Sequence, residues 1–383
     1  VFRSMTSLSK SASRKWSHAT SAGLLLVCTV FSGTRRSPSG RSAWRMYRRS
    51  AMASVHLYDL RPPGRHRWIP GDQYPRALAR AALLPIRGRP PGGLAKVTRN
   101  LGLGLDKIGQ AWRLHHRPDL PPGEEVLGIL HGPLDQVQAI ARERRCVTGV
   151  GVLNFPDEWP SMFQESKVKL HLQSCEWAAA YYRPYFGDRI RVWAFGIDTE
   201  EHAPRPSVAK EFDFLIYNKL RWPQELPEPN LREAVTQELT KRGLTFYEIT
   251  YGHYPGGREE AFHNLLGRSR SMLFLCENET QGAAYNEALS MGVPILAWNP
   301  LKWLDPERHN HGLSNWRASS VPYWDERCGE QFHSLPTFES TLERFLDRLR
   351  SDIYRPRSFV LENLRLDTCA KTYLAYLDEA ANL

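Results

Sequence analysis

Residues 272–300 read MLFLCENETQGAAYNEALSMGVPILAWNP and alternate apolar runs with a polar loop and a helical stretch. The apolar run 272–275 predicts a strand, 283–291 predicts a helix, and the apolar run 294–297 predicts a second strand. Polar residues 277–282 form the loop after the first strand. Because parallel α/β sheets bind ligands beyond the carboxyl ends of their strands, this loop is a candidate binding loop.

The same alternation of apolar runs and amphipathic helical stretches begins at residue 52 and is typical of parallel α/β layers. Further predicted strands are 55–60, 126–131, 147–154, 190–195, 212–217 and 245–250. Further predicted helices are 94–112, 134–144, 175–185, 231–242, 259–266, 337–349 and 359–377. The polar stretch 199–207 contains Pro204 and Pro206, which indicates a linker between two domains.

The net charge of +10 comes from the first fifty residues, which contain ten Lys or Arg and no Asp or Glu. The remaining 41 basic residues balance the 41 acidic residues, so no extended basic surface is expected for nucleic acid. Residues 1–51 are interpreted as a basic, disordered extension or as sequence upstream of a start at Met52, with a cleaved signal or transit peptide as the alternative. Six scattered cysteines without metal-ligand spacing are expected to be buried thiols of a cytoplasmic protein.

The loop and helix of the opening stretch contain residues suited to a nucleotide sugar. Gly282 lets the backbone approach a ligand, and the free amides of the helix that follows suit a diphosphate. Glu279 precedes the helix and Glu287 lies inside it, so one carboxylate can accept hydrogen bonds from a sugar and the other from a ribose. The alternative is that both are solvated acids near a helix N-terminus, where acids are favoured.

Glu279-Thr280-Gln281-Gly282-Ala283-Ala284-Tyr285-Asn286-Glu287-Ala288, followed by Gly292-Val293-Pro294, resembles the E-x7-E donor motif of retaining glycosyltransferases of the GT-B fold, group 1 or family 4. The resemblance covers about residues 90–380 and is strongest in 270–300. It implies an α/β protein with two Rossmann-like domains facing each other across a cleft, and a C-terminal helix that packs back toward the N-terminal domain. The corresponding ranges are 52–199 for the acceptor domain, 200–365 for the donor domain and 366–383 for the helix.

Other segments agree with the resemblance. Gly196-Ile197-Asp198-Thr199 is similar to the family's interdomain turn, and Gly92-Gly93 to its N-terminal glycine loop. Lys219, at the end of the strand 212–217, takes the place of the family's basic residue on the donor diphosphate, with Arg221 as its helper. The family has Arg first and Lys several residues later, so the second basic group stays open. Gly92 and Gly93 as an ordinary turn, and Lys219 as an exposed strand-end lysine, are the alternatives.

The first half of the chain offers fewer candidates. His131 ends a predicted strand and, by resemblance, lies near the donor sugar, although a lone histidine is usually structural. Asp157 and Glu158 follow another strand and are weak candidates for orienting the acceptor, with a Pro-Asp turn as the alternative.

The resemblance implies sugar transfer from a nucleotide-diphosphate sugar to an acceptor hydroxyl with retention of configuration. Catalytic roles fall on Glu279, Lys219 and His131, and donor binding on the group Glu287, Gly282, Gln281, Ala283, Arg221, Gly92 and Gly93. No cofactor or metal is expected, and the partners are a nucleotide sugar and a hydroxyl acceptor. A sugar-nucleotide epimerase or phosphorylase, or an inactive binding subunit, is the alternative; membrane association stays open, without a sequence feature that supports it.

Overall fold

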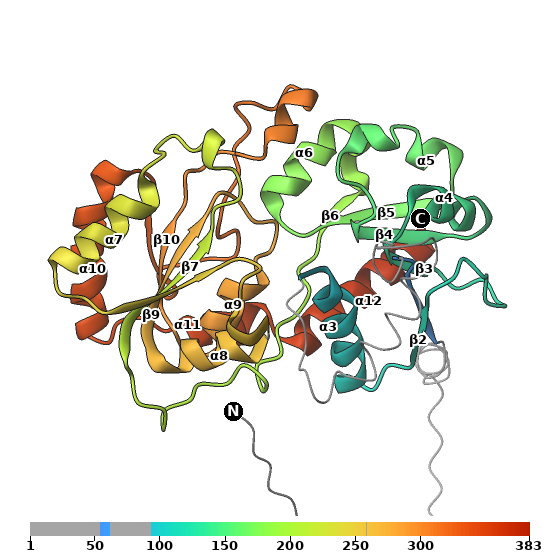
Figure 1. Ribbon diagram of the computed structural model, residues 1–383. Helices are drawn as coiled ribbons and strands as arrows, with labels where there is room; N and C mark the ends of the chain where they lie inside the picture. Colours follow the sequence, from blue (N-terminus) through green and yellow to red (C-terminus); the bar gives the residue numbers. More distant parts are fainter. Residues whose placement is uncertain (1–53, 62–92, 258) are drawn as a thin grey trace, which may run out of the picture. The chain divides into compact units, whose positions relative to one another are not determined.

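Two parallel sheets form from the aliphatic and β-branched runs of the sequence, and Figure 1 shows each with helices beside its strands. The structure is a computed structural model and describes residues 54–61, 93–257 and 259–383. These residues belong to one unit of the chain, residues 49–383. The predicted extension 1–51 and Gly92 of the predicted glycine loop lie outside the described residues.

The first sheet has six parallel strands in the order β2-β1-β3-β4-β5-β6. They are β1 (Val55–Asp59), β2 (Trp112–His115), β3 (Leu127–His131), β4 (Cys146–Gly151), β5 (Val168–Gln173) and β6 (Ile190–Val192). Its helices are α3 (Gly93–Lys107), α4 (Leu134–Glu143), α5 (Met162–Glu165), α6 (Glu176–Phe186) and α12 (Leu366–Asn382). Residues of α4, α5 and α6 share one buried cluster with Leu127 and Ile129, whereas residues of α3 and α12 share another with Leu130. Alternate side chains of β3 therefore serve opposite faces of the sheet.

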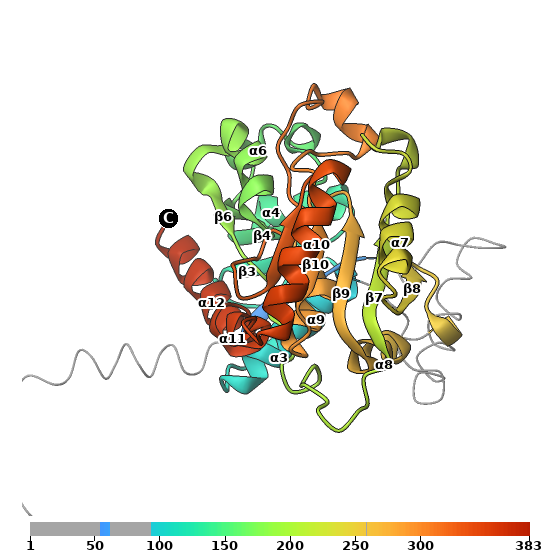
Figure 2. The ribbon, with the colours of Figure 1, turned by 90° about the vertical axis from the view of Figure 1, so that its left-hand side faces the viewer.

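The second sheet has five parallel strands in the order β11-β10-β9-β7-β8. They are β7 (Phe212–Lys219), β8 (Phe246–Thr250), β9 (Ser269–Cys276), β10 (Ile295–Trp298) and β11 (Gly329–Phe332). Its helices are α7 (Leu231–Lys241), α8 (Glu259–Arg268), α9 (Ala283–Ser290), α10 (Leu335–Arg350) and α11 (Pro356–Asn363). Phe214 and Ile216 pack with α7 and α10, and Leu215 and Tyr217 pack with α8 and α9. Figures 1 and 2 show these two pairs of helices on opposite faces of the strands.

The last helix returns to the first sheet. The indole of Trp193 donates to the carbonyl of Cys369 at 2.9 Å, and the hydroxyl of Tyr376 donates to the carbonyl of Val192 at 2.9 Å. These bonds join α12 to the chain at the end of β6. The predicted C-terminal helix that packs back toward the N-terminal domain is confirmed.

The predicted helix 359–377 was wrong, because the structure divides it into α11 and α12. At the break, the backbone N–H of Ile197 donates to the carbonyl of Leu364 at 2.7 Å. A Cβ added to Gly196 would lie 2.6 Å from the Cα of Leu366, so only glycine allows this approach. The break therefore lets the predicted interdomain turn pass against the C-terminal segment.

Three strands were not predicted. β2 and β11 are four-residue strands at the edges of their sheets, where a short run gives little periodicity. β5 reads VKLHLQ and does alternate apolar and polar residues at its start, so its pattern was available. None of the helices in the described ranges combines the length and apolar character needed to cross a membrane.

Candidate functional site

A cavity of about 590 Å³ lies where the carboxyl ends of β7 and β9 meet the first turns of α9 and α3. This is the edge of a parallel sheet at which ligands bind. Among the described residues that line the cavity, four are basic and one is acidic: Arg61, Lys96, Lys219, Arg221 and Glu279. The balance of side chains therefore suits an anionic ligand.

Lys219 and Glu279 meet inside this cavity. Lys219 ends β7, and its ammonium donates to Oε1 of Glu279 on the loop after β9. The ammonium also lies 4.6 Å from the centre of the Tyr251 ring. Burial lowers the pKa of Lys219. Glu279 and Cys276 raise it by more than burial lowers it, so the pKa of Lys219 lies above its ordinary value. Lys219 is therefore a lasting positive charge in the cavity.

Arg221 lies on the loop that follows β7. Its guanidinium donates to the carbonyl of Asn278 at 3.1 Å and lies 4.1 Å from the centre of the Trp222 ring. The fully buried Glu277 accepts a hydrogen bond of 2.9 Å from the backbone N–H of Trp222. These contacts fix the loop after β7 against the loop after β9, so that Lys219 and Arg221 line the same cavity.

The start of α9 borders the cavity. Gly282 caps the helix with φ +74°, and a Cβ there would lie 2.2 Å from the Tyr285 ring. Ala283 is the first helical residue, and the first turn contains no acidic residue that would compensate the free amides. The side chain of Gln281 accepts from the backbone N–H of Phe195 at 2.9 Å and donates to the carbonyl of the same residue. Gln281 thus lines the cavity and also ties the two domains together.

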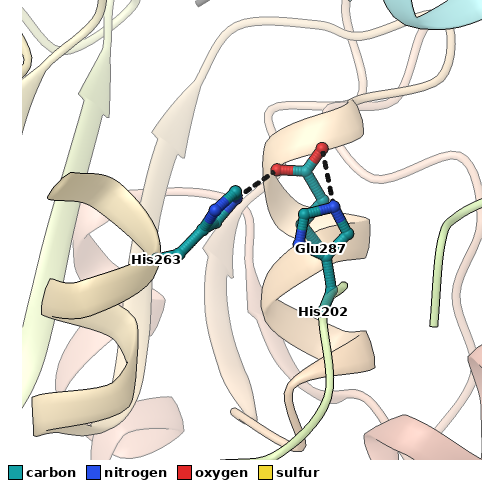
Figure 3. Close-up of side chains that lie close together, drawn as sticks. All are labelled: His202, His263 and Glu287. Atoms are coloured by element: carbon teal, nitrogen blue, oxygen red, sulfur yellow. Dashed lines mark hydrogen bonds and ion pairs between the residues drawn. The ribbon is translucent and has the colours of Figure 1, made fainter. Parts of the chain in front are cut away.

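Glu287 is buried on α9, 1% exposed, beside the cavity rather than on its wall. The ammonium of Lys96 donates to its Oε1, and Nε2 of His263 lies 3.0 Å from its Oε2. Nε2 of His202 lies 3.8 Å from Oε1, and Figure 3 shows both rings beside the carboxylate. Burial raises the pKa of Glu287, but Lys96 and the two histidines lower it more, and the group is ionised. Contact between Glu287 and a ribose therefore requires Lys96 to move.

His202, His263 and Glu287 are the described residues that could hold a metal ion, since their ligand atoms lie within 4.8 Å of one another. The Lys96 ammonium, however, contacts both Glu287 and Glu259. A divalent ion at this place would lie near that positive charge. The arrangement favours an ion-paired network, and the expected absence of a metal stays a prediction.

The structure does not bring His131, Asp157 and Glu158 to the cavity wall. His131 ends β3 and is fully buried, and burial lowers its pKa to about 4. Asp157 lies 2.9 Å from Nδ1 of His311, and Glu158 accepts from the backbone N–H of Asn154 at 3.0 Å. His131 is therefore a neutral side chain. Asp157 and Glu158 each have a hydrogen-bond partner outside the cavity.

Sequence reasoning missed Lys96 and Tyr251, which both line the cavity. Lys96 lies in the first turn of α3, three residues after Gly93. A positive side chain is disfavoured near the N-terminus of a helix. The position of Lys96 in the sequence could therefore have indicated that an acidic group outside α3 neutralises it. Tyr251 follows the short strand β8 and had no signal of its own.

Comparisons with known proteins find similarity in structure only. No protein-family model matches the chain, and no curated protein matches it. Sucrose-phosphate synthase from Thermosynechococcus elongatus matches with a TM-score of 0.50 and 9% identity, over 86% of this chain and 100% of that chain. An alpha-glucosyltransferase in complex with UDP and a 13-mer DNA matches with a TM-score of 0.50 and 10% identity, over 85% of this chain and 99% of that chain.

This chain has the GT-B fold. The predicted α/β architecture of two Rossmann-like domains is thereby confirmed. At 9–10% identity the likeness concerns the GT-B fold alone. The pneumococcal O-GlcNAc transferase GtfA, in complex with UDP and GlcNAc, also matches at 13% identity and a TM-score of 0.46, over 67% of this chain. The chain spans 57% of the length of that GtfA chain and 58% of the length of a chain in the GtfA/B complex.

Proposed function

We propose that this protein is a glycosyltransferase that moves a sugar from a nucleotide-diphosphate sugar to an acceptor hydroxyl with retention of configuration. The observation that carries the proposal is the convergence of Lys219, Arg221 and the start of α9 with Glu279 in one cavity. Cations and helix amides suit a diphosphate, and a carboxylate suits sugar hydroxyls. The GT-B fold, shared with a sucrose-phosphate synthase and an alpha-glucosyltransferase, supports the same proposal.

The reaction breaks the bond between the anomeric carbon and the diphosphate oxygen and forms a bond from that carbon to the acceptor oxygen. The acceptor proton passes to the departing phosphate. Lys219 turns from Glu279 to the diphosphate when the donor binds, and it stabilises the charge that develops on the leaving group. Glu279 is thereby free to hold the sugar hydroxyls.

The proposal includes no metal, because Lys219 and Arg221 neutralise the diphosphate. It also places the reaction in the cytoplasm. Five cysteines of the described ranges are free, buried thiols, which is usual in a reducing compartment. The acceptor hydroxyl of the proposal belongs to a glycan, a lipid-linked molecule or a small molecule, and a glycan acceptor would place the product in polysaccharide biosynthesis.

Donor hydrolysis tests the proposal. The protein is incubated with UDP-, GDP-, ADP- and dTDP-sugars, while nucleotide release and nucleotide affinity are measured. One donor is expected to be hydrolysed, and Lys219→Ala is expected to lower kcat/KM about 100-fold, as for loss of one charge-stabilising donor. Lys241→Ala is the matched control, since the Lys241 side chain is 70% exposed on α7.

Several outcomes would contradict the proposal. Binding of a nucleotide sugar without turnover indicates a binding subunit, and an isomerised sugar nucleotide indicates an epimerase. Loss of activity in EDTA, restored by a divalent ion, contradicts metal-free transfer. Proton NMR of the transferred product gives the anomeric configuration, and inversion contradicts retention.

A further inference from the structure

A second cavity, of about 280 Å³, adjoins the first. The two share Val150, Ser174 and Thr280 in their walls, and Thr280 directly follows Glu279. The indole of Trp177, on the wall of the second cavity, donates to the carbonyl of Glu279 at 2.9 Å. A molecule in the second cavity therefore lies next to the glutamate that is proposed to hold the donor sugar.

One side of this cavity is aromatic. We call Phe155, Trp177, Tyr181 and Trp303 the aromatic wall. The rings of Phe155 and Trp303 are stacked with centres 5.9 Å apart, and Trp177 and Tyr181 meet Trp303 edge-on at 5.5 Å and 5.7 Å. Trp303 follows β10 in the second domain, whereas the other three belong to the first. The aromatic wall is thus a packed surface built by both domains.

The remaining wall combines apolar side chains with polar and acidic ones. Asn154, Gln173, Asp305 and Glu307 contribute to it, and none of the described lining residues is Lys, Arg or His. A phosphate group in this cavity would meet two carboxylates without a cation on the wall to neutralise it. The lining therefore disfavours a phosphorylated ligand and tolerates hydroxyl groups.

Tyr181 supplies a second, independent sign of a ligand. The residue is 4% exposed and lines the cavity, and its hydroxyl has no hydrogen-bond partner among the described residues. Buried hydroxyls are normally hydrogen-bonded, since leaving one unpaired costs about 1–3 kcal/mol. The hydroxyl oxygen itself is buried, so a ligand hydroxyl in the cavity would satisfy this group after the Tyr181 side chain turns toward it.

We propose that the second cavity is the acceptor site and that it takes an uncharged sugar unit. One face of the sugar ring packs on the aromatic wall, and its hydroxyls bond to Tyr181 and to the acidic side. The volume lies just below the roughly 300–1,000 Å³ of typical small-molecule pockets, which suits one ring at a time. The assignment of this cavity as an acceptor site rests on the proposed function. Binding of a sugar in the cavity can be measured independently of that function.

Direct binding tests the proposal. Saturation-transfer NMR with the full chain compares methyl glycopyranosides with the same sugars carrying a 6-phosphate, with and without UDP. The uncharged glycosides are expected to bind, and the phosphorylated ones to bind at least tenfold more weakly. Tyr181→Phe removes only the hydroxyl and is expected to weaken glycoside binding about tenfold, while Tyr247→Phe, on an exposed tyrosine of β8, is the matched control.

The proposal is overturned if no uncharged glycoside binds, if the phosphorylated sugars bind better, or if Tyr181→Phe and Tyr247→Phe behave alike. Nucleotide affinity is measured on the same samples by calorimetry. Glycoside binding without any nucleotide binding would support the sugar site and contradict the proposed transferase function. Donor hydrolysis with transfer only to phosphorylated sugars would leave the transferase function standing and remove the acceptor assignment.

Discussion

Glu287 is buried with the Lys96 ammonium on one carboxylate oxygen and His263 on the other. Lys96 comes from α3 and also contacts Glu259, so one cation of the first domain neutralises two acids of the second. Removing one member of a buried pair leaves uncompensated charge, which is costly. The contribution of this network to the free energy of unfolding can therefore be measured by substituting Glu287 alone.

Glu287→Gln keeps the shape of the side chain and removes its charge. Glu259 still neutralises Lys96, so we expect the free energy of unfolding to fall by about 3 kcal/mol, the low end for a broken buried ion pair. Urea unfolding measures the loss, and Glu233→Gln on α7, whose side chain is 55% exposed, is expected to change it by less than about 0.5 kcal/mol. Equal losses in the two variants would mean that the buried pair contributes no net stability.

The loop after β9 ends at Gly282, the residue that caps α9. Its left-handed backbone and its close approach to the Tyr285 ring both favour glycine at this position. Gly282 and Gly243 both have a left-handed φ, at +74° and +69°, but a Cβ at Gly243 would meet nothing within 4 Å. Gly243→Ala is expected to cost about 1 kcal/mol, the conformational penalty alone. Gly282→Ala adds a collision with the buried Tyr285 ring, so we expect about 3 kcal/mol, as for overpacking, and a tenfold loss of nucleotide affinity. Calorimetry and urea unfolding compare the two variants, and equal effects would remove the special role of Gly282.

The elements around the cavity were predictable because their signals are local. β7, β9 and α9 show apolar runs or periodicity, Gly282 marks the turn between β9 and α9, and the observed bounds fall within three residues of the predicted ones. The break between α11 and α12 depends on Ile197, which bonds to Leu364 across more than 160 positions of sequence. Such a contact does not change the apolar periodicity of residues 359–377. The sequence pattern therefore predicted one continuous helix across the break.

At the scale of the whole molecule, the candidate site is divided between parts of the chain that sequence reasoning treats separately. Lys219, Arg221, Glu279 and Gly282 were predicted because a motif in one short stretch and the end of one strand contain them. Lys96 was missed because its partner Glu287 lies 191 positions away. Gln281 was predicted at the donor site, but its bonds to Phe195 of the first domain could not be predicted for the same reason.

The stability of the whole molecule is expected to depend on pH through its buried histidines. Burial lowers the pKa of His131 from 6.5 to about 4 and that of His171 to about 3. Between pH 6.5 and 4 the unfolded chain binds protons at these positions that the folded chain does not. Their stabilisation is therefore present above pH 6.5 and is lost as the pH falls, at roughly 1.4 kcal/mol per pH unit for each histidine.

Urea unfolding between pH 7 and 4.5 measures this dependence. His171 bonds to Thr148 and Gln173 in the core, and His171→Gln is expected to reduce the slope of unfolding free energy against pH by about one proton, although the variant is less stable throughout. The control is His253→Asn, at an exposed position after β8. If the slope of His171→Gln equals that of the unaltered protein, His171 takes up its proton in the folded state and acid sensitivity has another source. Below about pH 4.5, Glu287 adds to the loss, because the unfolded chain takes up a proton at this carboxylate while the folded protein, in which the pKa of Glu287 lies below its ordinary value, keeps it ionised.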